Sequence, residues 1–448
     1  MTHVTGGTRT IAQAALITLL GVGLTTPATA ATAATAATAA TAAIHTTASS
    51  TASSTASDRD VALTRWSSTR QFGRGTGDGV RAEGGELRLA RVTGGYQYRD
   101  PFGNGTTKAY DTARWTSPWV QPGFGLTEMV ASWDATTPRG TWIQVAGRGR
   151  TGRGGTGSWD VLGRWAGHDA GFHRTSVRGQ GDDYADVAVD TLGMNGTARY
   201  TAWQLKVTLL RPHGSSSSPT VQSVGAMASA LPGGTPPTSR TSMRRTIDVD
   251  VPRWSQMIHT GEYPQYDNGG EAWCSPTTMA MLIGRWDAGP TPREYAWVND
   301  SYAQPWVDHA ARNTFDYSYD GAGNWPFSTA YAGKQGLDSF VTRLRSLREA
   351  ERFVRAGIPL GVSVTFGRGE LSGSPISSTA GHVLVVRGFT ADGDVIVNDP
   401  AAPSKSSVRR VYDRAQFERA WLPTSGGLTY VVHPAGVALP RRTAQSSW

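Results

Sequence analysis

The stretch 269–282 contains Cys274, the only cysteine among 448 residues. A lone thiol cannot close an internal disulfide, so it is either inert and buried or reactive. Pro276 suits the first turn of a helix, apolar residues follow at three- and four-residue spacing, and Gly289-Pro290 would end the helix. The pattern predicts a helix that begins at Cys274. The dipole and free N–H groups of a helix start favour a thiolate, which is the nucleophilic form of cysteine.

The N-terminal residues are typical of an exported protein. Residues 1–30 combine Arg9, an apolar run too short to span a membrane and the small-residue sequence Ala28-Thr29-Ala30, as a signal peptide does. Residues 31–57 repeat Ala, Thr and Ser, and we expect them to be disordered. No later apolar run approaches ~20 residues, so we expect no transmembrane segment in the mature chain. The predicted location is secreted and extracellular, with cell-wall association left open.

The charge pattern argues against a nucleic-acid partner. The net charge is +8, but the basic residues, nearly all arginine, are interleaved with acids, without a basic block or a nucleic-acid motif. Attraction to anionic cell-wall polymers is one reading of such a surface. Arginine spread over a solvated surface is the simpler reading.

Residues 58–231 are expected to form an all-β domain, a sandwich or jelly roll. Short segments that alternate or are rich in β-forming residues are separated by clusters of Gly, Asn and Asp. The predicted strands are Glu86–Val92, Thr127–Asp134, Thr141–Val145, Asp160–Trp165, Ala185–Leu192 and Tyr200–Leu210.

Tryptophan is abundant in this domain and has two possible uses. Trp133, Trp142 and Trp203 lie within predicted strands, where we expect them to fill the core. Trp115 and Trp119 flank a Ser-Pro sequence and are the better candidates for stacking on a sugar ring. The sandwich is therefore a candidate module for binding a glycan or another cell-wall polymer.

A second domain follows a linker. Residues 232–246 are rich in Gly, Pro, Thr and Ser and predict the linker, residues 247–435 the second domain and residues 436–448 a basic tail. Within the second domain, the spacing of apolar residues predicts a helix over Asp338–Arg355 and a buried strand over Ile358–Phe366.

A cysteine nucleophile needs a base, and His382 is the best placed of the domain's histidines. It opens a predicted strand, a turn signal follows at Asp392-Gly393, and a second strand ends in Asn398-Asp399. With a two-residue turn, Asp399 would share a face with His382 but lie four residues further along, ~13 Å away. A direct hydrogen bond therefore requires a wider loop or a shifted register, and an odd shift would bring Asn398 in instead.

A cysteine nucleophile also needs donors for the developing oxyanion. Gln256 lies shortly before Cys274, and its side-chain N–H could act together with the Cys274 backbone N–H.

These motifs in order resemble a known family. The chain resembles papain-like cysteine peptidases, and more narrowly the bacteriocin-leader-processing (C39-like) peptidases of the exported, stand-alone type. The resemblance rests on four motifs in order: Gln256, Trp-Cys-Ser-Pro-Thr, Gly-His-Val and Asn-Asp-Pro. The resemblance covers residues 247–435. It implies an α+β papain-like fold with Cys274 as nucleophile, His382 as general base, Asp399 as orienting acid and Gln256 in the oxyanion hole. Two departures are Ser275, where the family more often has Gly, and the lack of transporter segments.

The predicted protein is thus multidomain, a β-sandwich followed by a cysteine peptidase domain that cleaves peptide or protein substrates through an acyl-enzyme. No cofactor and no metal are implied. A peptidoglycan amidase or endopeptidase and an acyltransferase are alternatives that would use the same thiol. A non-catalytic wall- or glycan-binding protein is the alternative that would not.

Overall fold

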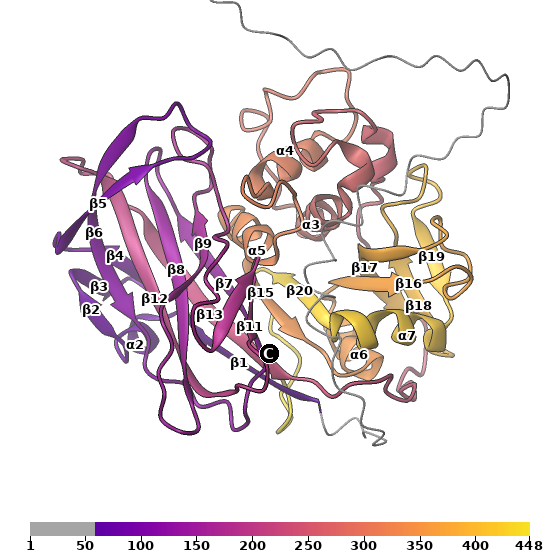
Figure 1. The fold of residues 1–448 in the computed structure, drawn as a ribbon. Helices are drawn as coiled ribbons and strands as arrows, with labels where there is room; N and C mark the ends of the chain where they lie inside the picture. Colours follow the sequence, from indigo (N-terminus) through magenta and orange to yellow (C-terminus); the bar gives the residue numbers. More distant parts are fainter. Residues whose placement is uncertain (1–58) are drawn as a thin grey trace, which may run out of the picture.

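The computed structural model describes residues 59–448. The predicted signal peptide and the Ala/Thr/Ser-rich segment lie outside the described residues. Two β-rich parts lie side by side (Figure 1). The first consists of two antiparallel sheets, and the second of one antiparallel sheet with helices around it. No helix among residues 59–448 combines the length and the apolar character needed to cross a bilayer.

The first part is a sandwich of two sheets that share one core. The first sheet runs β10-β11-β7-β13-β4-β3, with β1 beside β13, and the second runs β2-β6-β12-β8-β9, with β5 beside β6. The first sheet contains β1 (Asp60–Trp66), β3 (Val80–Glu83), β4 (Glu86–Leu89), β7 (Glu128–Thr136), β10 (Ala185–Ala188), β11 (Thr191–Met194) and β13 (Thr220–Ala230). The second contains β2 (Thr76–Asp78), β5 (Gly94–Arg99), β6 (Thr107–Thr116), β8 (Trp142–Thr151), β9 (Asp160–Trp165) and β12 (Tyr200–Pro212). A short helix, α2 (Thr69–Phe72), follows β1.

The tryptophans of the first part differ in how deeply their side chains are buried. Trp133 and Trp203 are fully buried in the core between the two sheets, which confirms the prediction for them. Trp142 is also fully buried, but it packs in a separate cluster with Tyr98, Tyr110 and Phe172. The expectation for Trp115 is wrong, because its side chain points inward from β6 and packs edge-on against Trp66, with ring centroids 5.4 Å apart. Trp119 is half-buried and remains the one candidate of that pair for a binding surface.

Several strands could not be seen in the sequence. The predicted strand Ala185–Leu192 is a hairpin of β10 and β11, which turns at Val189 with a positive φ of 59°. β13 pairs with both β1 and β7, yet it is rich in Ala, Ser and Gly, which are weak β-formers. At Gly225 a Cβ would lie 2.4 Å from the Thr64 carbonyl oxygen of the neighbouring β1, so the close approach of the two strands requires glycine there.

The second part is built on a sheet of order β15-β20-β16-β17-β18-β19, with β14 beside β17. Its strands are β14 (Ile247–Asp248), β15 (Asp338–Arg343), β16 (Leu360–Phe366), β17 (Thr379–Phe389), β18 (Val395–Asn398), β19 (Arg409–Tyr412) and β20 (Leu428–His433). The helices are α3 (Cys274–Gly284), α4 (Pro305–Thr314), α5 (Trp325–Lys334), α6 (Leu347–Arg355) and α7 (Arg414–Ser425), with short 3-10 turns η2 (Gln256–His259) and η3 (Gly270–Ala272).

One predicted helix is wrong over half of its length. The segment Asp338–Arg355 forms β15, which pairs with β20, and only then the helix α6, which begins after Ser346. The apolar residues of this segment fit helical spacing. However, β15 forms backbone hydrogen bonds with β20 along its whole length. Such tertiary pairing overrides the local sequence pattern. The strand predicted over Ile358–Phe366 is confirmed as β16.

The two parts share a packed interface. α5 lies between the sandwich and the strands β15 and β20 (Figure 1), and Phe327 of α5 belongs to the core of the sandwich. Polar contacts surround it: Asp190 accepts a hydrogen bond from the Trp325 backbone N–H at 2.7 Å, and Arg343 pairs with Glu128. The sandwich is therefore fixed against the second part.

The predicted linker and tail are both anchored. Residues 232–246 contain no helix or strand, but Thr241 and Ser242 donate hydrogen bonds to Glu351 of α6. The tail ends in Trp448, which is fully buried and packs on Phe353 with ring centroids 4.9 Å apart. Both segments therefore pack onto the second part.

Candidate active site

Cys274 lies at the predicted position, the first residue of α3. The residues that follow it, Ser275 to Gly284, are all buried, so α3 runs through the interior, while the thiol-bearing residue itself is half-exposed. The first N–H groups of a helix have no acceptor within it, so the backbone N–H of Cys274 is a suitable oxyanion donor. Thr278 donates a hydrogen bond to the Val383 carbonyl at 3.0 Å, and this contact fixes α3 against β17.

Ser275, a departure from the family pattern, is accommodated by a polar network. Its buried hydroxyl lies 3.0 Å from the Tyr430 hydroxyl and 3.4 Å from that of Ser328. The Tyr430 ring in turn packs on Trp325, with ring centroids 4.0 Å apart. Because Trp325 is also held by Asp190, the sandwich contacts the residue beside Cys274 through two intervening side chains.

His382 and Asp399 are in direct contact. His382 Nε2 lies 2.7 Å from Asp399 Oδ1, and the two side chains are only 4% and 1% exposed. This contact uses Nε2, so Nδ1 is the ring nitrogen left for the thiol. Cys274 is one of the groups that raise the pKa of His382, so its side chain lies near the ring.

The register of β17 and β18 explains how the pair meets. The loop between the strands spans residues 390–394 rather than two residues, which shifts the pairing by one. A bulge at Arg387 shifts it by one more, so Asn398 pairs with Val385 and the position opposite Asp399 is Leu384. Either shift alone would turn Asp399 to the other face, and the two together restore it. The remaining two residues are ~7 Å, a diagonal distance that side chains can bridge.

Asn398 forms hydrogen bonds with residues other than His382, and these are structural. Its amide donates to the Pro252 carbonyl at 2.8 Å, and its oxygen accepts from Arg387 at 3.1 Å. Through these contacts Asn398 holds the segment that leads to Gln256.

Tyr412 is the residue that sequence reasoning missed. Its hydroxyl donates to Asp399 Oδ2 at 2.7 Å, and the Ala401 backbone N–H donates to Oδ1 at 3.0 Å. Tyr412 lies in β19, at the far side of β18, and only the pairing of these strands brings it near. No motif in the sequence marks it.

The electrostatics of the pair favour two opposite charges. Burial opposes the charged form of His382, but the Asp399 carboxylate and Cys274 outweigh it and raise the pKa of His382 to about 10. Burial likewise opposes ionisation of Asp399, but His382, Tyr412 and the Ala401 N–H together lower the pKa of Asp399 below its ordinary value. At neutral pH the site therefore holds an imidazolium and a carboxylate.

Gln256 begins η2, and its position relative to the pair is fixed by backbone contacts. The Gln256 N–H donates to the Pro400 carbonyl at 2.9 Å, directly after Asp399. Its side-chain N–H donates to the Glu271 carbonyl at 2.7 Å, and its side-chain oxygen is buried without a partner among residues 59–448. The amide thus lies beside the segment that precedes Cys274 but is hydrogen-bonded to it rather than free.

The other histidines of the second part have different partners. His309 Nδ1 contacts the Tyr331 hydroxyl at 2.8 Å, and burial lowers the pKa of His309 to about 3. His433 contacts the Pro434 carbonyl, and His259 lies with two carboxylates beneath η2.

Comparison with known proteins gives matches for both parts. Residues 62–229 match the model of the peptidase C39 N-terminal domain, and residues 249–428 match that of the peptidase C39-like family. A crystal structure from Bacillus anthracis, described as that of a C39-like peptidase, matches with 18% identity over 42% of this chain and 97% of its own, at a TM-score of 0.26. No curated protein matches the chain significantly. On the two family matches, the chain belongs to the C39-like cysteine peptidases.

Proposed function

We propose that the protein is an exported cysteine peptidase with a papain-like second domain, in which Cys274 attacks peptide bonds with His382 and Asp399 as its partners. The observation that carries the proposal is the buried contact between His382 and Asp399 beside a helix that starts at Cys274. An imidazolium next to a thiol favours the thiolate, so the nucleophile is ready before substrate arrives.

In the proposed reaction, His382 donates a proton in the first half and accepts one in the second, and the Cys274 sulfur forms and then releases the acyl group. The Cys274 thiolate adds to the scissile carbonyl, and the oxyanion is stabilised by the Cys274 backbone N–H and by Gln256 once its amide leaves the Glu271 carbonyl. His382 gives its proton to the leaving amine, which completes an acyl-enzyme. His382 then takes a proton from water, which attacks the thioester and releases the acid. Asp399 holds the imidazole in place through both halves.

Oxygen-18 incorporation tests this function directly. The wild-type protein should cleave denatured protein or isolated wall peptides in labelled water and leave one heavy oxygen in each new carboxylate, as mass spectrometry would detect. We expect Cys274→Ala to lose at least ~10⁴-fold in kcat, as removal of other nucleophiles does. Equal cleavage by Cys274→Ala would exclude the proposal. Products that carry an added amine instead of oxygen-18 would identify an acyltransferase, and cleavage of wall peptides alone would identify a wall peptidase.

The pH dependence of kcat/KM tests the role of Asp399. The Asp399 carboxylate raises the pKa of His382, whereas burial of the imidazole lowers it. In Asp399→Asn the carboxylate is gone, and burial becomes the dominant influence on the pKa of His382. The imidazolium is then lost at a lower pH, and the alkaline limb of the profile should move down from about 10. Tyr412→Phe is the matched control, since it removes one hydrogen bond of ~1.5–3 kcal/mol but keeps the charge, and its alkaline limb should stay near that of the wild type. An unchanged limb in Asp399→Asn would contradict the role.

A second function is proposed for the outer face of the β6-β12-β8-β9 sheet, namely binding of an anionic polymer such as one of the cell wall. Arg150 lies 4.0 Å from the Trp119 ring centre, and Arg148 and Lys206 lie 4.3 and 4.2 Å from that of Trp159. Within residues 59–448 no carboxylate forms an ion pair with these three cations. Burial and the nearby arginines lower the pKa of Lys206 to about 8, and an anion would relieve that repulsion.

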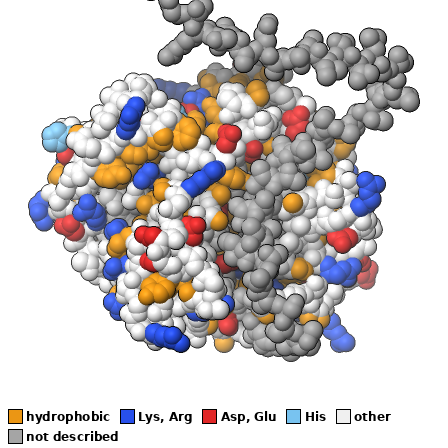
Figure 2. All heavy atoms as spheres, viewed as in Figure 1, with side chains coloured by type: hydrophobic (Ala, Val, Ile, Leu, Met, Phe, Trp, Pro, Cys, Tyr) orange, Lys and Arg blue, Asp and Glu red, His pale blue; other side chains and the backbone are white. Residues whose placement is uncertain are grey.

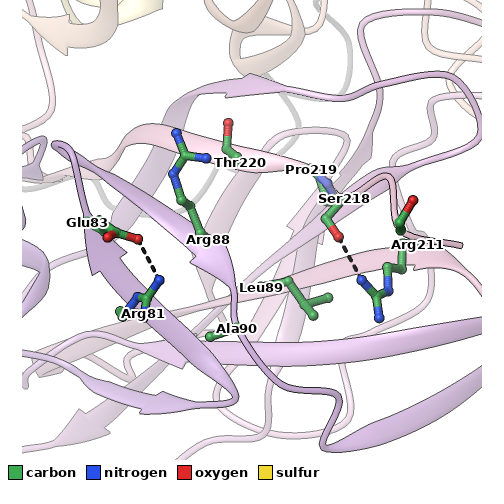
Figure 3. Close-up of a pocket in the computed structure, with 10 residues that line it drawn as sticks. Arg81, Glu83, Arg88, Leu89, Ala90, Arg211, Ser218, Pro219 and Thr220 are labelled. Carbon is green, nitrogen blue, oxygen red and sulfur yellow. Dashed lines mark hydrogen bonds and ion pairs between the residues drawn. The ribbon is translucent and has the colours of Figure 1, made fainter.

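Two other places where basic side chains lie differ from this group. On the face seen in Figure 2, Lys and Arg are scattered among Asp and Glu. A hollow of about 370 Å³ on the sandwich is lined by Arg81, Arg88 and Arg211 (Figure 3), but these pair with Glu83, Glu86 and Asp111. Its arginines are already neutralised.

Binding of soluble poly(glycerol phosphate) tests the surface. The double variant Arg148→Ala/Arg150→Ala should bind at least ~10-fold more weakly, since each cation near an anionic surface contributes ~1 kcal/mol. The matched control Arg81→Ala/Arg88→Ala removes as much charge from the hollow and should bind like the wild type. Equal losses in both variants would show that net charge, not this surface, governs binding.

A further inference from the structure

Three ionisable side chains outside the proposed triad meet beneath η2. His259 Nδ1 lies 2.7 Å from Glu262 Oε2 and 3.3 Å from Asp308 Oδ2. One such atom from each residue lies within 4.8 Å of the other two. His259 and Asp308 are fully buried, and the Glu262 side chain is 11% exposed. The group therefore presents one nitrogen and two carboxylates to a common point away from solvent.

Hydrogen bonds do not satisfy this group. The single Nδ1–H of His259 serves Glu262, and neither oxygen of Asp308 accepts a hydrogen bond from any residue between 59 and 448. The first turn of α4 favours a negative side chain at Asp308, but it supplies no donor to the carboxylate. A buried carboxylate without a hydrogen bond is costly, and the 3.3 Å contact of Asp308 with His259 lies inside the cluster, so the Asp308 oxygens are available to bind a cation there.

The distances suit a transition-metal cation. Zn²⁺ binds histidine nitrogen and carboxylate oxygen at ~2.0–2.2 Å, which places two tetrahedral ligand atoms ~3.3 Å apart. His259 Nδ1 and Asp308 Oδ2 have that separation. Glu262 is closer to the nitrogen, at hydrogen-bond distance, and would retreat by roughly half an ångström when it binds the ion. The nitrogen ligand disfavours Ca²⁺ and Mg²⁺, which take oxygen ligands, and suits Zn²⁺, while the two carboxylates also suit Mn²⁺.

We propose that His259, Glu262 and Asp308 bind one divalent transition-metal cation, Zn²⁺ or Mn²⁺, that ties η2 to α4. The tie would also reach the segment before α3, because the Trp273 ring packs on His259 with ring centroids 5.9 Å apart. The cation thus secures the segment that carries Gln256 and the residue that precedes Cys274. The site does not depend on the proposed peptidase activity.

Binding is measured in a Cys274→Ala background, so that the thiol cannot compete for metal. After dialysis against EDTA, titration with Mn²⁺ followed by electron paramagnetic resonance should give one ion per chain, Zn²⁺ should displace it, and either ion should raise the melting temperature. Asp308→Asn should weaken binding at least tenfold and abolish the thermal shift. Asp300→Asn, which removes an exposed carboxylate just before α4, should change neither.

The alternative is that a proton on Glu262, rather than a cation, neutralises part of the cluster, since burial raises the pKa of Glu262 to about 7. In that case the Mn²⁺ titration would show no site of one ion per chain, and neither cation would shift the melting temperature. Either result would overturn the proposal, as would equal Mn²⁺ affinity in Asp308→Asn. If Asp308→Asn does not fold, Glu262→Gln provides the same comparison.

Discussion

The buried contact between His382 and Asp399 is the interaction on which the site depends. Two ionisable side chains at 4% and 1% exposure are stable only if further hydrogen bonds satisfy them, because burial of charge costs several kcal/mol per ion. Tyr412 and the Ala401 N–H supply those bonds to Asp399. The contact therefore requires a set register of β17, β18 and β19, and the wide loop and the bulge at Arg387 together provide it.

The remaining parts of the site are fixed to this pair by a few contacts. Thr278 holds α3, and with it Cys274, against the strand that carries His382. The Gln256 backbone is bonded to Pro400, the residue after Asp399, while Asn398 holds the segment before Gln256. On the far side, the sandwich reaches Ser275 through Trp325 and Tyr430. The proposed nucleophile, base, orienting acid and oxyanion donor thus come from separate segments that converge on one strand pair.

The sequence predicts those parts of the site that local chemistry marks. A proline in the first turn and apolar spacing indicated the helix start at Cys274, and side-chain parity favoured Asp399 over Asn398 as the neighbour of His382. Tyr412 could not be predicted, because a strand pairing brings it in and no motif marks it. Nor could the inward orientation of Trp115 or the strand β15, since the partner strands, not the local pattern, decide both. The cluster at His259 was missed for the same reason, as its third member lies on another helix.

We propose that His382 keeps Cys274 reactive, and the pH dependence of alkylation by iodoacetamide is the measurement that decides this. Because Cys274 is the only cysteine of the sequence, alkylation of a thiol by iodoacetamide measures the reactivity of Cys274 alone. The second-order rate of alkylation of the wild type should already be near its plateau at neutral pH. In His382→Ala the rate should instead rise with the titration of an ordinary thiol, near pH ~8.5. Superimposable profiles for the two proteins would show that His382 does not activate the thiol.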